Sequence, residues 1–134
     1  MMNQPEGRRK EPATRSASAP RVEERASFVE MRLDSARRAF TSDAALAESL
    51  GVSPSQVARW RKGQRPDTEN LERLVAIDVI VELLTGVLSA GRIPKWLSGP
   101  NANLGGRTPL GVLRQGDLPS VVAAVRVLKS GAYA

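Results

Sequence analysis

Residues 43–60 read DAALAESLGVSPSQVARW, and their spacing is that of a helix-turn-helix. Ala47 is a small residue at the point where a second helix must cross the first one closely. Gly51, four residues later, suits the left-handed conformation in which the first helix has to end. Val57, six residues after the glycine, points from the second helix into a core shared by both. This stretch therefore predicts two short helices packed around a tight turn.

The second helix of this motif has its own start signal, which is independent of the spacing. Ser53 can cap the helix, Pro54 suits its first position, and Gln56 can reach back to close a capping box. Gly63 marks the end, so this helix is expected over 54–62. Because the turn spacing and the capping signals agree, the helix-turn-helix is the central prediction.

The flanking segments also have a helical pattern, and no strand-like alternation of any length occurs. The helix expected before the motif spans 24–40, with an apolar stripe of Phe28, Met31, Leu33, Ala36 and Phe40. A helix is expected over 43–50, capped by Thr41 or Ser42, and a long helix runs from Asp67 or Thr68 to about Ala90, where Gly91 ends it. A brief turn at 93–97 and a loop at 98–106 follow. Thr108 caps the next helix, which Gly116 ends, and the last helix runs from Asp117 or Leu118 to about Ser130. The predicted fold class is all-α.

The long helix after the motif is apolar over more than half of its circumference. A three-helix DNA-binding head cannot cover such a surface, so either the C-terminal segment or a second subunit must cover it. We therefore expect a disordered basic arm at 1–24, a helix-turn-helix head at 25–66, and a long helix with a small C-terminal module at 67–134.

The composition restricts the chemistry that this chain can perform. Its 134 residues allow one ordinary domain, or two small modules that share a core. Histidine and cysteine are both absent, which excludes disulfides, thiol nucleophiles, Ser-His-Asp triads and the usual zinc sites. Few acidic residues lie together, so we expect no catalytic residues, no metal and no cofactor, and an enzyme is a poor interpretation.

The charge distribution favours an anionic partner for the first half of the chain. The net charge is +6, and residues 26–65 hold seven basic and four acidic side chains, as expected if this half meets phosphate. The N-terminus lacks the apolar core of a signal peptide, and the most apolar stretch, Leu71–Leu88, is interrupted by Asp78 and Glu82. Together with the absence of cysteine, this predicts a cytoplasmic protein that does not enter the membrane. The arm could add phosphate contacts or serve only as a solubilising tail.

The second helix of the motif would enter the major groove of DNA with its early outward side chains at the base edges. Arg59 is the best candidate for reading a base, because its planar guanidinium matches guanine. The predicted DNA-binding residues are Ser53, Ser55, Gln56, Arg59, Arg61, Lys62 and Arg65. Of these, Arg61, Lys62 and Arg65 suit phosphates, and Arg37 and Arg38 are further candidates for contacts with the DNA backbone. Gln56 could instead serve the capping box, and Arg59 could be a solvated surface residue. Trp60 is interpreted as a core anchor rather than a base-stacking platform.

The last forty residues carry an ordered series of turn and anchor residues. The series is Trp96, Pro100, Asn101, Leu104, Gly106, Pro109, Leu113 and Gly116, followed by an apolar helix that ends near Gly131. It resembles the toxin-binding C-terminal domain of the Xre/MbcA/ParS antitoxin family, and the helix-turn-helix and long helix resemble that family's N-terminal part. The resemblance covers about residues 40–134.

The resemblance implies a bacterial antitoxin of a type II toxin–antitoxin system. Members bind a RES-domain toxin that degrades NAD, cover its active-site cleft with their C-terminal region, and often repress their own promoter through the Xre-like head. It also implies a homodimer that assembles with the toxin into a hetero-oligomer. Among the motif positions, Trp96, Pro100, Asn101, Gly106 and Pro109 look structural, whereas the residues expected to meet the toxin are Arg107, Arg114 and the chain end from Lys129 through Tyr133 to Ala134.

A second interpretation shares every DNA-binding expectation. The chain could be a stand-alone helix-turn-helix regulator whose C-terminal domain serves dimerisation or another protein partner. A neighbouring gene for a RES-type protein would distinguish the two.

Overall fold

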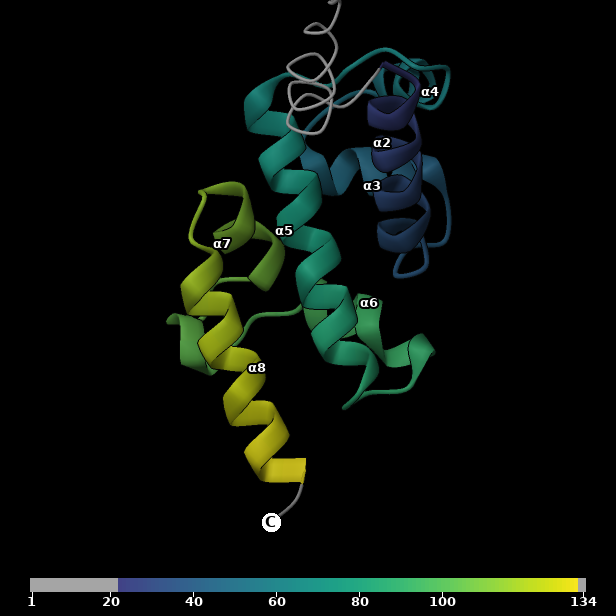
Figure 1. The fold of residues 1–134 in the computed structure, drawn as a ribbon. Coiled ribbons are helices and arrows are strands. Elements are labelled where there is room, and N and C mark those ends of the chain that lie inside the picture. Colours follow the sequence, from purple (N-terminus) through teal and green to yellow (C-terminus); the bar gives the residue numbers. More distant parts are fainter. Residues whose placement is uncertain (1–21, 133–134) are drawn as a thin grey trace, which may run out of the picture.

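In the computed structural model, which describes residues 22–132, every regular element is helical (Figure 1). This confirms the predicted all-α fold. The predicted arm at 1–24 lies outside the described residues, except for its last three, with which the first helix begins. The elements are α2 (Val22–Arg37), α3 (Asp43–Leu50), α4 (Pro54–Arg61), α5 (Thr68–Thr85), η2 (Ala90–Arg92), α6 (Ile93–Ser98), η3 (Ala102–Leu104), α7 (Pro109–Arg114) and α8 (Leu118–Ala132).

Side chains cap the first turns of several helices at the positions that the sequence predicts. The hydroxyl of Ser42 accepts from the Ala45 N–H at 3.0 Å, and α3 begins there. Three further side chains cap helices in the same way, Ser53 for α4, Thr108 for α7 and Asp117 for α8. Each of these oxygens satisfies a backbone N–H that the first helical turn leaves unpaired. The Ser120 hydroxyl and N–H both donate to Asp117, which lowers the pKa of that carboxyl.

Helix α2 buries only part of the predicted apolar stripe. Leu33 and Ala36 are fully buried, as predicted, and Phe40 packs against the core from the turn that follows. Phe28 is 39% exposed and Met31 64% exposed, so neither belongs to the core, and the helix ends at Arg37 rather than Phe40. Val29, which the predicted stripe left out, lies on the buried face instead. This face and the turn after it bury Val29, Leu33, Ala36 and Ala39.

Helix α5 ends at Thr85, one turn before the predicted end near Ala90. Gly86 follows it, and the N–H groups of Val87 and Leu88 both return to the carbonyl of Leu84. These bonds turn the chain back, and the half-buried Leu88 packs against the core. The apolar character that predicted a longer helix therefore belongs to the turn and not to α5.

Helix α5 lies between the two halves of the structure (Figure 1). It contacts α2 and α3 of the N-terminal half and α6, α7 and α8 of the C-terminal half, and one hydrophobic cluster runs through both halves. The sequence left two candidates to cover the apolar surface of α5, the C-terminal segment and a second subunit. In the structure the C-terminal segment of the same chain covers it. No helix within residues 22–132 is long and apolar enough to cross a membrane.

Candidate functional site

Helix α4 presents one face to the core and the opposite face to solvent. Val57 is fully buried and Trp60 is 2% exposed, so Trp60 is a core anchor, as predicted, and cannot serve as a base-stacking platform. Gly51 adopts a φ of +78°, the left-handed conformation that the predicted turn requires. Ser55 and Arg59 lie on the exposed face of α4. The motif therefore places an exposed polar helix face next to a rigid turn, as a DNA-reading helix requires.

The side chain of Gln56 does not close the predicted capping box. Its backbone N–H donates to the Ser53 hydroxyl at 3.2 Å, which forms half of the predicted capping box. Its side-chain Oε1, however, accepts from Nη2 of Arg59 at 2.6 Å. A charge-assisted bond to a residue three positions along the same face is stronger than a return to the cap N–H. Gln56 and Arg59 therefore form a joined pair on the exposed side of α4.

Arg61 is held by carboxylates and not presented to solvent as a free cation. Its Nε and Nη2 donate to Asp43 at 2.7 and 2.9 Å, and its Nη1 donates to Asp34 at 2.8 Å. The hydrogen bonds from Arg61 lower the pKa of Asp43 more than its partial burial raises it, and the charges of Arg61 and Arg37 lower it further. The same bond to Asp43 raises the pKa of the Arg61 guanidinium. Arg61 therefore ties α4 to α2 and α3, in place of the predicted phosphate contact.

The other basic residues of the head divide into two groups. Arg37 donates to the carbonyls of Phe40 and Thr41, and Arg38 pairs with Glu82 of α5 at 3.1 Å. Lys62 and Arg65 are exposed, and neither forms an ion pair within the described part of the chain. The exposed cations available to DNA at the end of α4 are therefore Lys62 and Arg65, beside the Gln56–Arg59 pair.

The loop around Asn101 fixes the shape of the C-terminal module. Its Oδ1 accepts from the Asn103 N–H at 2.9 Å, and its carbonyl accepts from the Gly106 N–H at 2.9 Å. Gly106 has a φ of +84°, so the turn favours glycine at this position. Trp96 is only half-buried, and the neighbouring Leu97 is the fully buried anchor. The motif residues around Asn101 thus hold a turn, which agrees with their interpretation as structural.

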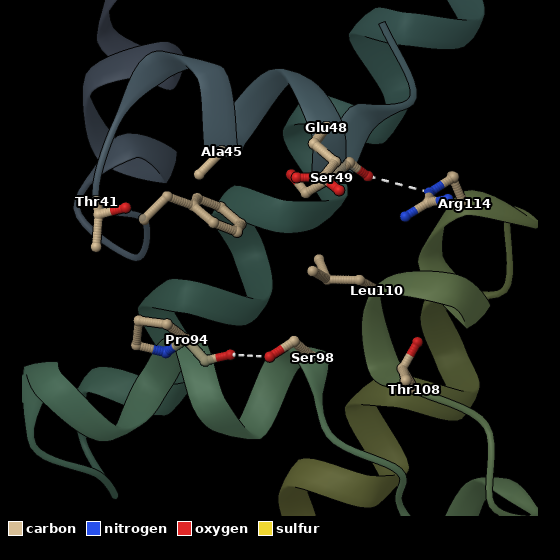
Figure 2. Close-up of a pocket in the computed structure, with 10 residues that line it drawn as sticks. Thr41, Ala45, Glu48, Ser49, Pro94, Ser98, Thr108, Leu110 and Arg114 are labelled. Atoms are coloured by element: carbon tan, nitrogen blue, oxygen red, sulfur yellow. Dashed lines mark hydrogen bonds between the residues drawn. The ribbon is translucent and has the colours of Figure 1, made fainter.

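The residues expected to meet a toxin lie in different parts of the structure and have different hydrogen-bond partners. Arg107 is exposed and donates to the Leu104 carbonyl at 3.0 Å and to Oε1 of Gln115 at 3.1 Å, within its own module. Arg114 instead reaches across to α3, where its Nε donates to the Ser49 carbonyl at 3.1 Å (Figure 2). Lys129 is exposed near the end of α8. Tyr133 and Ala134 lie outside the described residues.

Two hollows lie beside these residues. One, with a volume of about 380 Å³, separates α3 from α6 and α7 and is lined by Glu48, Ser98, Leu110 and Arg114 among others (Figure 2). The other, of about 570 Å³, lies between α2, α5 and the segment that runs from the end of α7 to the start of α8. Within residues 22–132 no group of three or more acidic side chains is placed to hold a metal ion.

An ion pair between α2 and α5 was missed by the sequence reasoning. Asp78 is only 3% exposed and pairs with Arg32, whose guanidinium also lies 4.9 Å from the centre of the Phe28 ring. In the sequence, Asp78 stands out only as an interruption of an apolar stretch. A lone carboxylate within an apolar helix requires a cationic partner when it is buried, and this signal could have indicated the pair.

Comparison with known proteins finds similarity to a helix-turn-helix family and to an antitoxin. The family described as helix-turn-helix matches residues 41–77. The mycobacterial cidal antitoxin MbcA from Mycobacterium bovis and from Mycobacterium tuberculosis is 29% identical over 89 residues, which cover 66% of this chain and 79% of MbcA. The crystal structure of the M. tuberculosis MbcT–MbcA toxin–antitoxin complex contains a chain with a TM-score of 0.63 and 28% identity. That match covers 79% of this chain and 94% of the other.

Proposed function

We propose that this chain, which has an Xre-type helix-turn-helix domain and is homologous to the MbcA antitoxins, is the antitoxin of a type II system. It blocks a RES-domain toxin that degrades NAD, and it represses its own promoter. One observation carries the proposal: the similarity to the antitoxin of the MbcT–MbcA complex extends over 79% of this chain and includes more than the helix-turn-helix. The protein acts as a binding partner in the bacterial cytoplasm and performs no catalysis.

The DNA-binding half of the proposal rests on the exposed face of α4. The Gln56–Arg59 pair reads a base edge, because a guanidinium bonded to an amide is oriented before it meets the DNA. Ser55, Lys62 and Arg65 are exposed around it and contact the backbone, and Ser53 keeps the cap in place. Arg61 supports this surface through its carboxylate partners. The head that we assign to DNA is 25–66.

The toxin-binding half rests on residues 67–134. Arg107, Arg114 and Lys129 are basic and exposed, and the chain continues past Lys129 to Tyr133 and Ala134. Basic groups suit a toxin cleft that has to accommodate a charged dinucleotide. The resemblance of the series from Trp96 to Gly131 to the toxin-binding domain of Xre/MbcA/ParS antitoxins supports a RES-domain partner.

The protein is proposed to act as a homodimer when it binds DNA. A single head of this size reads one half-site, and helix-turn-helix proteins pair two half-sites about one helical turn of DNA apart. The dimer then combines with the toxin into a hetero-oligomer. Light scattering of the purified chain, alone and with the toxin, measures both stoichiometries.

Co-expression with the protein encoded by the neighbouring gene tests the antitoxin function. That protein alone should arrest growth and deplete intracellular NAD, and the full chain should restore both. A chain that lacks 92–134 should fail to restore them, whereas a Lys62→Ala variant, changed only on the DNA side, should restore them fully. Complete neutralisation by the shortened chain would contradict the role assigned to the C-terminal module.

The stand-alone regulator remains the second candidate, because the helix-turn-helix family itself matches only residues 41–77. In that case the chain would repress its promoter with no effect on a neighbouring toxin. A gel-shift assay together with the co-expression experiment separates the two, since only the antitoxin rescues growth.

A further inference from the structure

The last turn of α3 is capped by a side chain from the other half of the structure. The carbonyl of Ser49 accepts the Nε–H of Arg114, which lies 65 residues later at the end of α7 (Figure 2). The last carbonyls of a helix have no partner within the helix, and a cation there also meets the negative end of the helix dipole. A Cβ at Gly51 would lie 3.7 Å from Cδ of Arg114, so the aliphatic part of Arg114 lies beside the turn. Arg114 therefore contacts the segment that sets the angle between α3 and α4.

Little else joins the head directly to the C-terminal segment. Within residues 22–132, the Arg114–Ser49 bond is the one hydrogen bond or ion pair that links α2, α3 or α4 to the chain after α5. The hollow of about 380 Å³ separates α3 from α6 and α7 beside it. Interfaces that are closely packed resist displacement, and a hollow of this size removes such contacts. Arg114 thus makes the direct polar contact between α7 and the end of α3.

We propose that Arg114 is a positioning residue that couples the C-terminal module to the DNA-binding turn. The inference rests on the proposed function, in which one module binds a toxin and the other binds DNA. A guanidinium has five N–H donors, and the bond to Ser49 uses only the one on Nε. The two terminal nitrogens make no hydrogen bond within the described residues, and Arg114 is exposed. A carboxylate on the bound toxin pairs with these nitrogens while Nε keeps the Ser49 carbonyl.

The coupling is positive in sign. A toxin carboxylate on the terminal nitrogens fixes the Arg114 side chain, which in turn fixes the end of α3 and the turn before α4. The head then loses less conformational freedom when it binds DNA, so toxin binding raises the affinity for DNA. Because coupling between two binding sites is reciprocal, DNA binding also makes α7 less mobile.

Amide hydrogen exchange of the full chain tests the positioning role without any partner. The reporters are the N–H groups of Gly51 and Val52, which bond to the carbonyls of Glu48 and Ala47. In Arg114→Met, which keeps an aliphatic stem but loses the donor, both amides should exchange at least about fivefold faster than in the unchanged protein. Arg107→Met is the matched control, because the bonds of Arg107 stay within its own module, and it should leave both rates unchanged.

The amide of Ile80, in the middle of α5, reports global stability in the same experiment. If the Gly51 and Val52 rates do not change in Arg114→Met, or if they rise only as much as the Ile80 rate, the positioning role is overturned. A rise confined to the turn supports it.

Addition of a DNA duplex that spans the region upstream of the gene tests the coupling itself. In the unchanged protein the duplex should slow exchange in α4 and also at Val112 and Leu113 of α7. In Arg114→Met it should slow exchange in α4 alone. Protection of α4 without protection of α7 in the unchanged protein overturns the coupling and leaves the proposed DNA binding intact. No protection anywhere overturns the proposed DNA binding, and the coupling with it.

Discussion

The ion pair between Arg61 and Asp43 gives the sharpest test of how the DNA-reading helix is held. Arg61→Met keeps most of the aliphatic stem and removes two hydrogen bonds to Asp43 and one to Asp34. A hydrogen bond to a charged group contributes roughly 1.5–3 kcal/mol when it is well buried. The side chain of Arg61 is only 25% exposed, but Asp43 is 39% and Asp34 66% exposed, so solvent screens much of this gain. We expect a net loss of about 1–2 kcal/mol of unfolding free energy.

Urea denaturation followed by circular dichroism measures this loss at pH 7, and a melting temperature lower by roughly 4–10 °C should accompany it. The pH dependence provides a second signature. Because the pKa of Asp43 is lowered below its ordinary 3.8, the pair stabilises the protein fully above about pH 5, and this stabilisation is lost as the pH falls through the lowered pKa. The difference in unfolding free energy between the unchanged protein and Arg61→Met should therefore become smaller below about pH 4.

Arg38→Met is the matched control, because Arg38 and Glu82 are both about 60% exposed. This exposed pair should contribute less than about 1 kcal/mol. If Arg61→Met loses no more stability than Arg38→Met, or if its deficit persists undiminished at pH 3, the interpretation of Arg61 as the tether of α4 is wrong.

Three further changes test the turn, the core and the DNA-reading face. Gly51→Ala places a side chain at a φ of +78° and should lower the unfolding free energy by about 1–2 kcal/mol. Gly91→Ala, at an open position, should change the unfolding free energy little, and equal effects of the two changes in thermal unfolding would contradict the turn geometry. Trp60→Ala removes a side chain that is 2% exposed and should lose about 3–5 kcal/mol in urea denaturation, and a loss below 1 kcal/mol would show that Trp60 does not anchor the core. Arg59→Ala should weaken binding to a preferred duplex by about 1–3 kcal/mol and relax the sequence preference at one base position, while the stability of the protein stays unchanged. An unaltered gel-shift titration would show that Arg59 does not read a base.

The features that the sequence predicted well depend on chemistry within a few residues. The caps at Ser42, Ser53 and Thr108 each use a hydroxyl three residues before the N–H that it accepts. The turn at Gly51 depends on the backbone freedom of one residue, and the burial of Trp60 follows from its place on the inner face of α4. Such signals are local, so the order and character of the helices could be read without knowing the tertiary packing.

The features that the sequence missed join residues far apart in the chain. Arg114 contacts Ser49 across 65 residues, and Arg32 pairs with Asp78 across 46. An arginine in an exposed helical pattern looks the same whether it faces DNA, a toxin or a carboxylate of its own chain. Arg61 was therefore placed with the phosphate contacts, although the fold brings Asp43 and Asp34 to it. Only the packing of α2, α3 and α7 could reveal these partners.

The proposed function of this chain is to neutralise a toxin that degrades NAD. NAD consumption by the purified protein of the neighbouring gene, measured alone and with increasing amounts of the full chain, tests this function directly. NAD consumption should stop once the chain reaches the stoichiometry of the complex, and the chain lacking 92–134 should leave it unchanged. NAD consumption that continues at saturating full-length chain, or a neighbour that consumes no NAD, would contradict the antitoxin function.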